Sequence, residues 1–82
     1  MPNKLRTLSG SEIIKFLEKN GFAVHSTHGS HTKLKRTVNE NIQTLVVPLH
    51  KPIAKGTLRD IYNQIPEYMP ASSESRDFFF TE

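Results

Sequence analysis

The chain has 82 residues with no cysteine and no tryptophan, and its formal net charge is +3 at pH 7. This length allows one small domain without room for a deep cofactor cavity, and so it argues against a large enzyme fold. The lack of cysteine removes disulfides and cysteine-based metal sites and fits a reducing compartment. No segment resembles a signal peptide or approaches the roughly 18 apolar residues that a membrane span needs. We therefore expect a soluble cytoplasmic protein that does not bind a membrane.

The charge is distributed unevenly along the chain. Residues 1–65 contain ten Lys and Arg against four Asp and Glu, whereas residues 66–82 contain one against four. A basic domain followed by an acidic tail favours a polyanionic ligand such as nucleic acid. We accordingly predict a folded basic domain at 1–66 and an acidic, aromatic-containing C-terminal tail at 67–82.

A first helix is predicted to begin at Ser9, because Ser9 and Glu12 have the spacing of a capping box, in which each side chain binds a free backbone amide of the other residue. Apolar residues between positions 13 and 17 form a stripe along this helix. Asn20 and Gly21 supply a left-handed stop at its C-terminal end.

Strand-forming residues occupy the middle of the chain. Glycine and small hydroxyl residues indicate a turn, and alternation of polar and apolar residues indicates a strand. The last strand is expected to stop before Pro48, since proline has no backbone N–H to donate to a neighbouring strand. The predicted order is a short strand at 22–24, a turn at 26–30, a strand at 31–38, a hairpin connection at 39–41 and a strand at 42–47. In the second strand, one face carries His31, Lys33 and Lys35, and the other carries Thr32, Leu34, Arg36 and Val38.

A second helix is predicted to start at Thr57, with Asp60 three residues later and apolar residues at helical spacing up to Ile65. We expect Pro66 to end this helix and residues 66–70 to be extended, followed by a linker at 71–76. The apolar residues 78–80 either pack back on the domain or contact a partner.

The predicted element order is α-β-β-β-α. Three antiparallel strands with both helices on one face make an α+β two-layer domain, an arrangement that double-stranded-RNA-binding domains also have. A fold of this kind does not by itself assign an activity.

Metal binding is one hypothesis for the four histidines. His25, His28 and His31 have a spacing that would align them on a helix, but the Gly-Ser turn makes their side chains diverge, and no cysteine or acidic residue lies in the segment to complete a site. We therefore expect no metal and no other cofactor.

His31 is the first candidate for chemistry, although a solvent-facing strand residue is the simpler interpretation of a single histidine. Histidine can accept or donate a proton near neutral pH, and Lys33 and Lys35 beside it can stabilise the charge of a phosphate. RNA carries its own 2′-hydroxyl nucleophile, so a small site needs only a proton-transfer group and cations. His28, just before the turn, is an alternative to His31.

Basic residues also surround the start of the second helix. His50 lies in a loop between two prolines, where a structural side chain hydrogen-bonding the loop is favoured over proton transfer. Lys51, Lys55 and Arg59 can contact RNA phosphates near the free amides of the helix N-terminus, or form an ordinary solvated face.

These pieces together resemble the HicA toxin family of small messenger-RNA endonucleases. The resemblance covers about residues 9–65, and the order and spacing of the matching pieces are more specific than any one of them. The pieces are the helix and its exit at 12–22, Gly29-Ser30-His31, Val47-Pro48-Leu49-His50, and Lys55-Gly56-Thr57-Leu58-Arg59 with Ile61.

The resemblance implies a metal-independent endoribonuclease that cleaves messenger RNA and is neutralised by a HicB-like antitoxin, with which it can form an oligomer. It places the catalytic histidine at His31. Many relatives have a second histidine directly after this position, or have their single histidine there, whereas this chain has Thr32. If the chemistry needs a histidine at position 32, this copy is impaired or inactive. The RNA contacts that we predict with it are Ser30, Lys33, Lys35, Lys51, Lys55 and Arg59.

Two other functions fit the same residues. The basic face can bind double-stranded RNA by shape and phosphate contacts without cleaving it. Alternatively, the domain serves mainly to bind a protein, in which case it has no salt-sensitive affinity for RNA.

Overall fold

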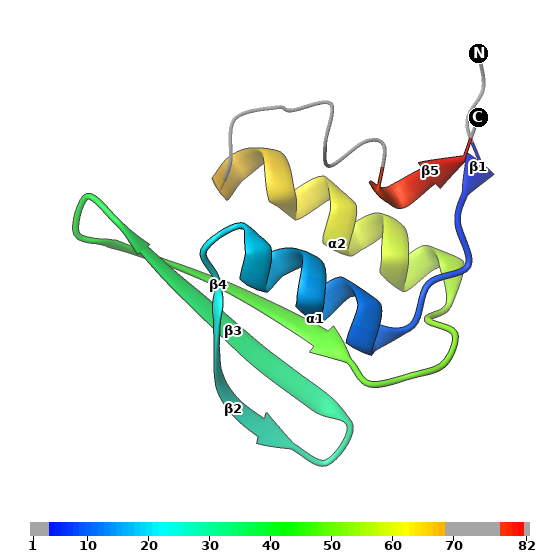
Figure 1. Cartoon of the computed structure of the whole chain (residues 1–82), viewed down its shortest axis with the longest axis horizontal. Coiled ribbons are helices and arrows are strands. Elements are labelled where there is room, and N and C mark those ends of the chain that lie inside the picture. The colour runs from blue at the N-terminus through cyan, green and yellow to red at the C-terminus, as the bar shows by residue number, and fades with distance from the viewer. Residues whose placement is uncertain (1–3, 69–77, 82) are drawn as a thin grey trace.

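Three strands form an antiparallel sheet in the order β2-β3-β4, and two helices cover one of its faces (Figure 1). The computed structural model describes residues 4–68 and 78–81. The predicted α+β class, with two helices and a three-stranded antiparallel sheet, is confirmed; the closer likeness to double-stranded-RNA-binding domains stays a prediction. The elements are β1 (Lys4–Leu5), α1 (Gly10–Lys19), β2 (Ala23–His28), β3 (His31–Val38), β4 (Asn41–Pro48), α2 (Lys55–Tyr68) and β5 (Phe80–Thr81).

Helix α1 begins at the predicted capping box. The Ser9 backbone N–H donates to the Glu12 carboxylate at 2.8 Å, and the Glu12 N–H donates to the Ser9 hydroxyl at 3.2 Å. The bond from the Ser9 backbone N–H holds the pKa of the Glu12 carboxyl below its ordinary value. At the other end, Gly21 adopts a positive φ of 95°, which glycine tolerates without strain, so the predicted stop is also confirmed.

The hairpins of the sheet are tighter than the sequence predicted. Strand β2 runs to His28 instead of ending at residue 24, and a two-residue turn at Gly29 and Ser30 leads directly into β3. Gly29 has a φ of +59°, as the first position of a two-residue hairpin turn often requires. The second turn contains only Asn39 and Glu40, and Asn41 is already in β4.

The expected ends of two elements were wrong. Strand β4 includes Pro48 as its final residue, where the ladder does not need a further donor. Helix α2 starts at Lys55, two residues before Thr57, with Leu58 N–H donating to Ala54 C=O at 2.9 Å. The helix also passes Pro66 and ends at Tyr68, because a proline in the last turns removes only one intrahelical hydrogen bond.

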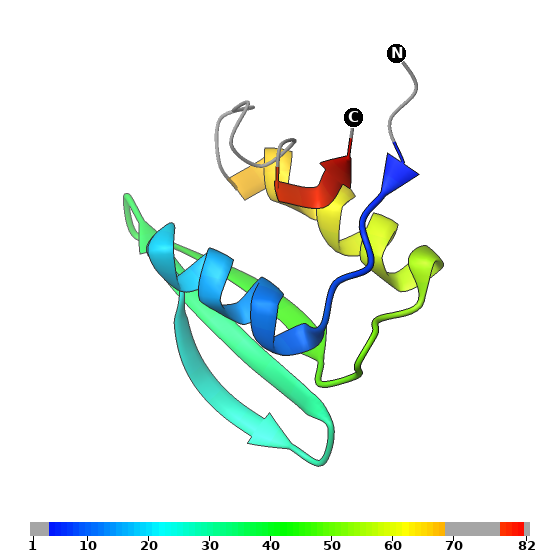
Figure 2. The same ribbon diagram turned by 45° about the vertical axis from the view of Figure 1, so that its right-hand side comes forward.

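The phenylalanines near the C-terminus pack back on the domain. Phe79 is fully buried, and β5 pairs with β1 in a second, two-stranded sheet, with Leu5 opposite Phe80. The stacked rings of Phe16 and Phe78 lie 4.3 Å apart. Figure 2 shows this C-terminal segment lying against α2, next to the N-terminal strand.

Residues 78–80 therefore belong to the same packed unit as the helices, which answers the question that the sequence left open. A domain boundary at residue 66 stays a prediction, and the linker expected at 71–76 lies outside the described residues.

None of the described helices is long and apolar enough to span a membrane. The core consists of Leu8, Ile13, Leu17, Phe22, Leu34, Leu45, Val47, Ile53, Leu58, Ile61, Ile65 and Phe79.

Candidate nucleic-acid interface

The sheet face opposite the helices is open to solvent (Figure 1). In β3, Thr32 and Leu34 are buried towards the helices, whereas His31 and Lys33 are exposed and Lys35 is half-buried. Because side chains alternate along a strand, His31, Lys33 and Lys35 share the open face, as the alternation predicted. The sheet therefore presents one imidazole and two ammonium groups in a row.

His31 lies at one end of this row, directly after the Gly29–Ser30 turn. Its cross-strand partners are His28 on β2 and Pro48 on β4. Both His28 and His31 are exposed. A short turn and two neighbouring strands thus fix the backbone of His31 while leaving its side chain accessible to a ligand.

The residue after His31 points the other way. Thr32 is only 3% exposed, and its hydroxyl lies 3.3 Å from the Thr27 hydroxyl on β2. A side chain at position 32 therefore faces the helices and not the open face that carries His31.

The loop after β4 brings His50 to the same end of the sheet. Leu49 N–H donates to Ser30 C=O at 2.5 Å, and Gly10 N–H donates to His50 C=O at 3.0 Å. These backbone bonds hold the loop against both the β2–β3 turn and the start of α1. The imidazole rings of His31 and His50 consequently lie 6.4 Å apart between centroids, with their planes inclined at 67°.

The proximity of His50 to His31 was not predicted from the sequence. His50 was expected to hydrogen-bond its loop with its side chain, but the structure holds the loop through backbone atoms and leaves the His50 side chain exposed. Within the described ranges, neither imidazole has a hydrogen bond to another residue. Both rings are therefore available to a ligand.

The predicted RNA contacts fall into separate groups. Ser30 and Lys33 are exposed beside His31, and Arg59 is exposed near the start of α2. Lys55 instead binds within the protein: its ammonium group donates to the backbone carbonyls of residues 5 and 6 at 2.9 Å each and contacts the Thr7 hydroxyl at 3.3 Å. In this position Lys55 joins the N-terminal segment to α2.

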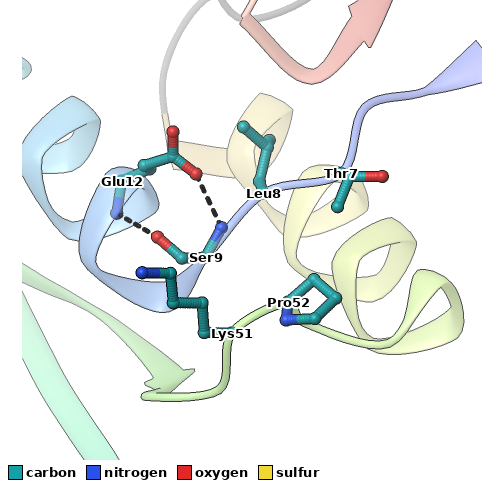
Figure 3. Close-up of a pocket in the computed structure, with 6 residues that line it drawn as sticks. All are labelled: Thr7, Leu8, Ser9, Glu12, Lys51 and Pro52. Carbon is teal, nitrogen blue, oxygen red and sulfur yellow. Dashed lines mark hydrogen bonds between the residues drawn. The ribbon is translucent and has the colours of Figure 1, made fainter.

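Lys51 lies near the start of α1 rather than on the sheet. Its positive charge is one of the causes that lower the pKa of Glu12, after the hydrogen bonds from Ser9 and the charge of Arg6. Figure 3 shows the Lys51 side chain extending towards Ser9 and Glu12. It borders an open pocket of about 410 Å³ lined by Thr7, Leu8, Ser9, Glu12, Lys51 and Pro52.

No histidine lines this pocket, so the hollow at the α1 N-terminus and the histidine pair are different features. In the portion of the chain that the structure describes, no three His, Cys, Asp or Glu side chains are placed to hold a metal ion. The histidine end of the sheet combines two exposed imidazoles with the ammonium group of Lys33. These groups can bind a phosphodiester and transfer protons to and from its oxygens.

Gly10 allows the close contact that positions His50. A Cβ atom at residue 10 would collide with the Pro48 backbone carbonyl, which cannot move without displacing the end of β4. We expect Gly10→Ala to lower the free energy of unfolding by about 1 to 3 kcal/mol, because the core would be overpacked. Gly56→Ala is the matched control, since the space around Gly56 in α2 is empty and alanine favours a helix. Thermal unfolding of both variants, followed by circular dichroism, checks this; equal melting temperatures would show that the contact does not matter.

Comparison with known proteins gives one match. Residues 10–65 match the family described as the HicA toxin of bacterial toxin-antitoxin systems, a region that runs from the start of α1 to Ile65 in α2. No curated protein and no solved structure matches the chain. Because the matched region is more than half of the chain, the protein belongs to the HicA toxin family.

Proposed function

We propose that the chain is an endoribonuclease toxin that cleaves messenger RNA in the cytoplasm, with His31 as a general acid or base. Membership of the HicA toxin family supports the toxin role. The observation that carries the proposal is the exposed His31 at the end of a cationic row on an uncovered sheet face. RNA phosphates can approach such a face without any rearrangement of the fold.

The reaction requires no group beyond RNA and the protein side chains. The 2′-oxygen of the substrate attacks the adjacent phosphorus, the bond from phosphorus to the 5′-oxygen breaks, and the products are a 2′,3′-cyclic phosphate and a 5′-hydroxyl. One proton leaves the 2′-hydroxyl and one proton reaches the departing 5′-oxygen, so His31 can serve in either transfer. Lys33 and Lys35, on the same face, stabilise the negative charge that develops on the phosphate.

A HicB-like antitoxin is the proposed protein partner, in a complex that can contain several chains. The open face also carries apolar residues: Ile42 is 64% exposed and Val46 is 44% exposed, opposite Thr37 and Lys33 in the sheet. Cations interspersed with exposed apolar side chains suit a protein surface of acidic and apolar residues. Such a partner would cover His31 and exclude RNA.

The alternative function is binding of double-stranded RNA without cleavage. It is favoured by the same cationic row, because a shape-reading module needs phosphate contacts and no proton-transfer group. If this function is correct, His31→Ala retains salt-sensitive RNA binding and the native protein produces no fragments.

The end groups of the RNA products test the proposed reaction. Purified chain is incubated with labelled messenger RNA in the presence of EDTA, and the fragment ends are identified by their reaction with polynucleotide kinase and phosphatase. We expect 2′,3′-cyclic phosphate and 5′-hydroxyl ends, because the 2′-oxygen is the nucleophile. Fragments with 3′-hydroxyl and 5′-phosphate ends, or cleavage that EDTA abolishes, would contradict the mechanism.

A further inference from the structure

We propose that His50 is a second catalytic residue, which transfers a proton to or from one reacting oxygen while His31 serves the other. The proposal rests on the proposed ribonuclease function and adds a residue to the same site. It follows from the fold rather than from the sequence, where His31 and His50 are 19 positions apart.

The two rings lie close enough to each other to act on one phosphodiester group. Their centroids lie 6.4 Å apart and their planes are inclined at 67°, so both rings border the same small area of the surface. The attacking and leaving oxygens lie on opposite sides of phosphorus in an in-line displacement. Two exposed imidazoles that border one site can serve these two oxygens separately, which one histidine cannot do at the same moment.

The solvent exposure of the two rings is typical of functional side chains and not of aromatic rings that stabilise a core. Aromatic rings that stabilise a fold are normally buried, as Phe79 is here. His31 and His50 are both exposed, and neither imidazole has a hydrogen bond to another residue in the described ranges. The two rings are therefore accessible at the surface and are not part of the core.

The backbone around His50 shows that its position is fixed. Its own carbonyl accepts the Gly10 N–H at 3.0 Å, the preceding residue donates to Ser30 C=O, and Ile53 N–H donates to Leu8 C=O at 2.9 Å. All these bonds involve main-chain atoms only. A substitution of the His50 side chain should thus leave the loop in place and remove only the imidazole, which makes the variant a clean test.

The test is the pH dependence of RNA cleavage by the wild-type chain, His31→Gln and His50→Gln. With one histidine acting as base and the other as acid, the wild-type rate falls on both sides of an optimum. We expect each variant to be slower by about 10²- to 10⁴-fold and to lose one side of this profile, with a different side lost in each. His25→Gln is the control: His25 is exposed on β2 and outside the pair, and it should keep both sides of the profile and the wild-type rate.

A substrate with sulfur in place of the 5′-bridging oxygen then identifies the acid. Its thiolate leaves without a proton, so the variant lacking the acid is rescued on this substrate and the variant lacking the base is not. A His50→Gln variant that is folded and keeps both sides of the pH profile would overturn the proposal, whatever its rate. Failure of the wild-type chain to cleave any RNA would instead refute the proposed function itself, and the two failures are distinguishable.

Discussion

Replacing Phe79 by alanine should lower the free energy of unfolding by about 3 to 5 kcal/mol, which is the usual range for removing a buried phenylalanine. Phe79 is fully buried, and its ring lies 5.3 Å from Tyr62 of α2 and 5.9 Å from Phe16 of α1. It therefore joins both helices on the side away from the sheet. Urea denaturation followed by circular dichroism measures the loss.

The control for Phe79→Ala is Ile42→Ala, since Ile42 is apolar but 64% exposed on the open sheet face. Its truncation should cost less than about 1 kcal/mol, mainly through a lower preference for the strand. Small domains have a total stability of about 5 to 15 kcal/mol, so the Phe79 variant should lose a large part of it. Equal denaturation midpoints for the two variants would show that the C-terminal phenylalanines are not part of the core.

His31→Ala should reduce the rate of RNA cleavage by about 10²- to 10⁴-fold, the usual contribution of a general acid or base. The melting temperature should change little, because His31 is exposed and its side chain has no hydrogen bond in the described part of the chain. Initial rates on a labelled RNA, together with thermal unfolding of the same samples, measure both quantities.

His28→Ala decides between the two histidines that face each other across the β2–β3 hairpin. His28 is also exposed and is the direct strand partner of His31, so the two substitutions remove the same side chain from neighbouring positions. We expect a loss of at most a few-fold for His28→Ala, because the His50 ring lies 6.4 Å from the ring of His31 and no ring contact of His50 with His28 occurs among the described residues. A larger loss for His28→Ala than for His31→Ala would move the site to His28.

Local signals in the sequence were sufficient for α1 and for the faces of β3. The Ser9 capping box and the Gly21 stop act within one or two turns of the chain, and the alternation that buries Thr32 and exposes His31 is a property of the strand alone. These features do not depend on distant residues. The sequence therefore predicted where His31 and its lysines point.

The errors arose where tertiary contacts override local preference. The end of α2 is a separate case, because Pro66 was expected to end the helix but its local cost in the last turns is small and the helix continues to Tyr68. The ammonium group of Lys55 binds carbonyls of the N-terminal segment, 50 and 49 residues away in the chain, which the sequence did not indicate; its contact with RNA stays a prediction. The pairing of β1 with β5 likewise joins the two ends of the chain, and no local pattern specifies it.

The proximity of His31 and His50 illustrates the same limit at the functional site. It depends on the Gly10 and Leu49 backbone bonds, which form only when α1, the β2–β3 turn and the loop after β4 meet. Each histidine alone is an ordinary exposed side chain. Only the folded chain shows that they form a pair.

The central claim is that His31 makes this chain a messenger-RNA endonuclease, and the integrity of cellular RNA tests it most directly. The wild-type chain and His31→Ala are induced at equal levels in a host without the antitoxin, and full-length messenger RNA is followed over time by northern blot. The claim predicts loss of full-length messenger RNA and growth arrest with the wild-type chain, and intact RNA with normal growth for the variant. Equal RNA decay with both chains, or intact RNA with both when both are folded, would contradict it.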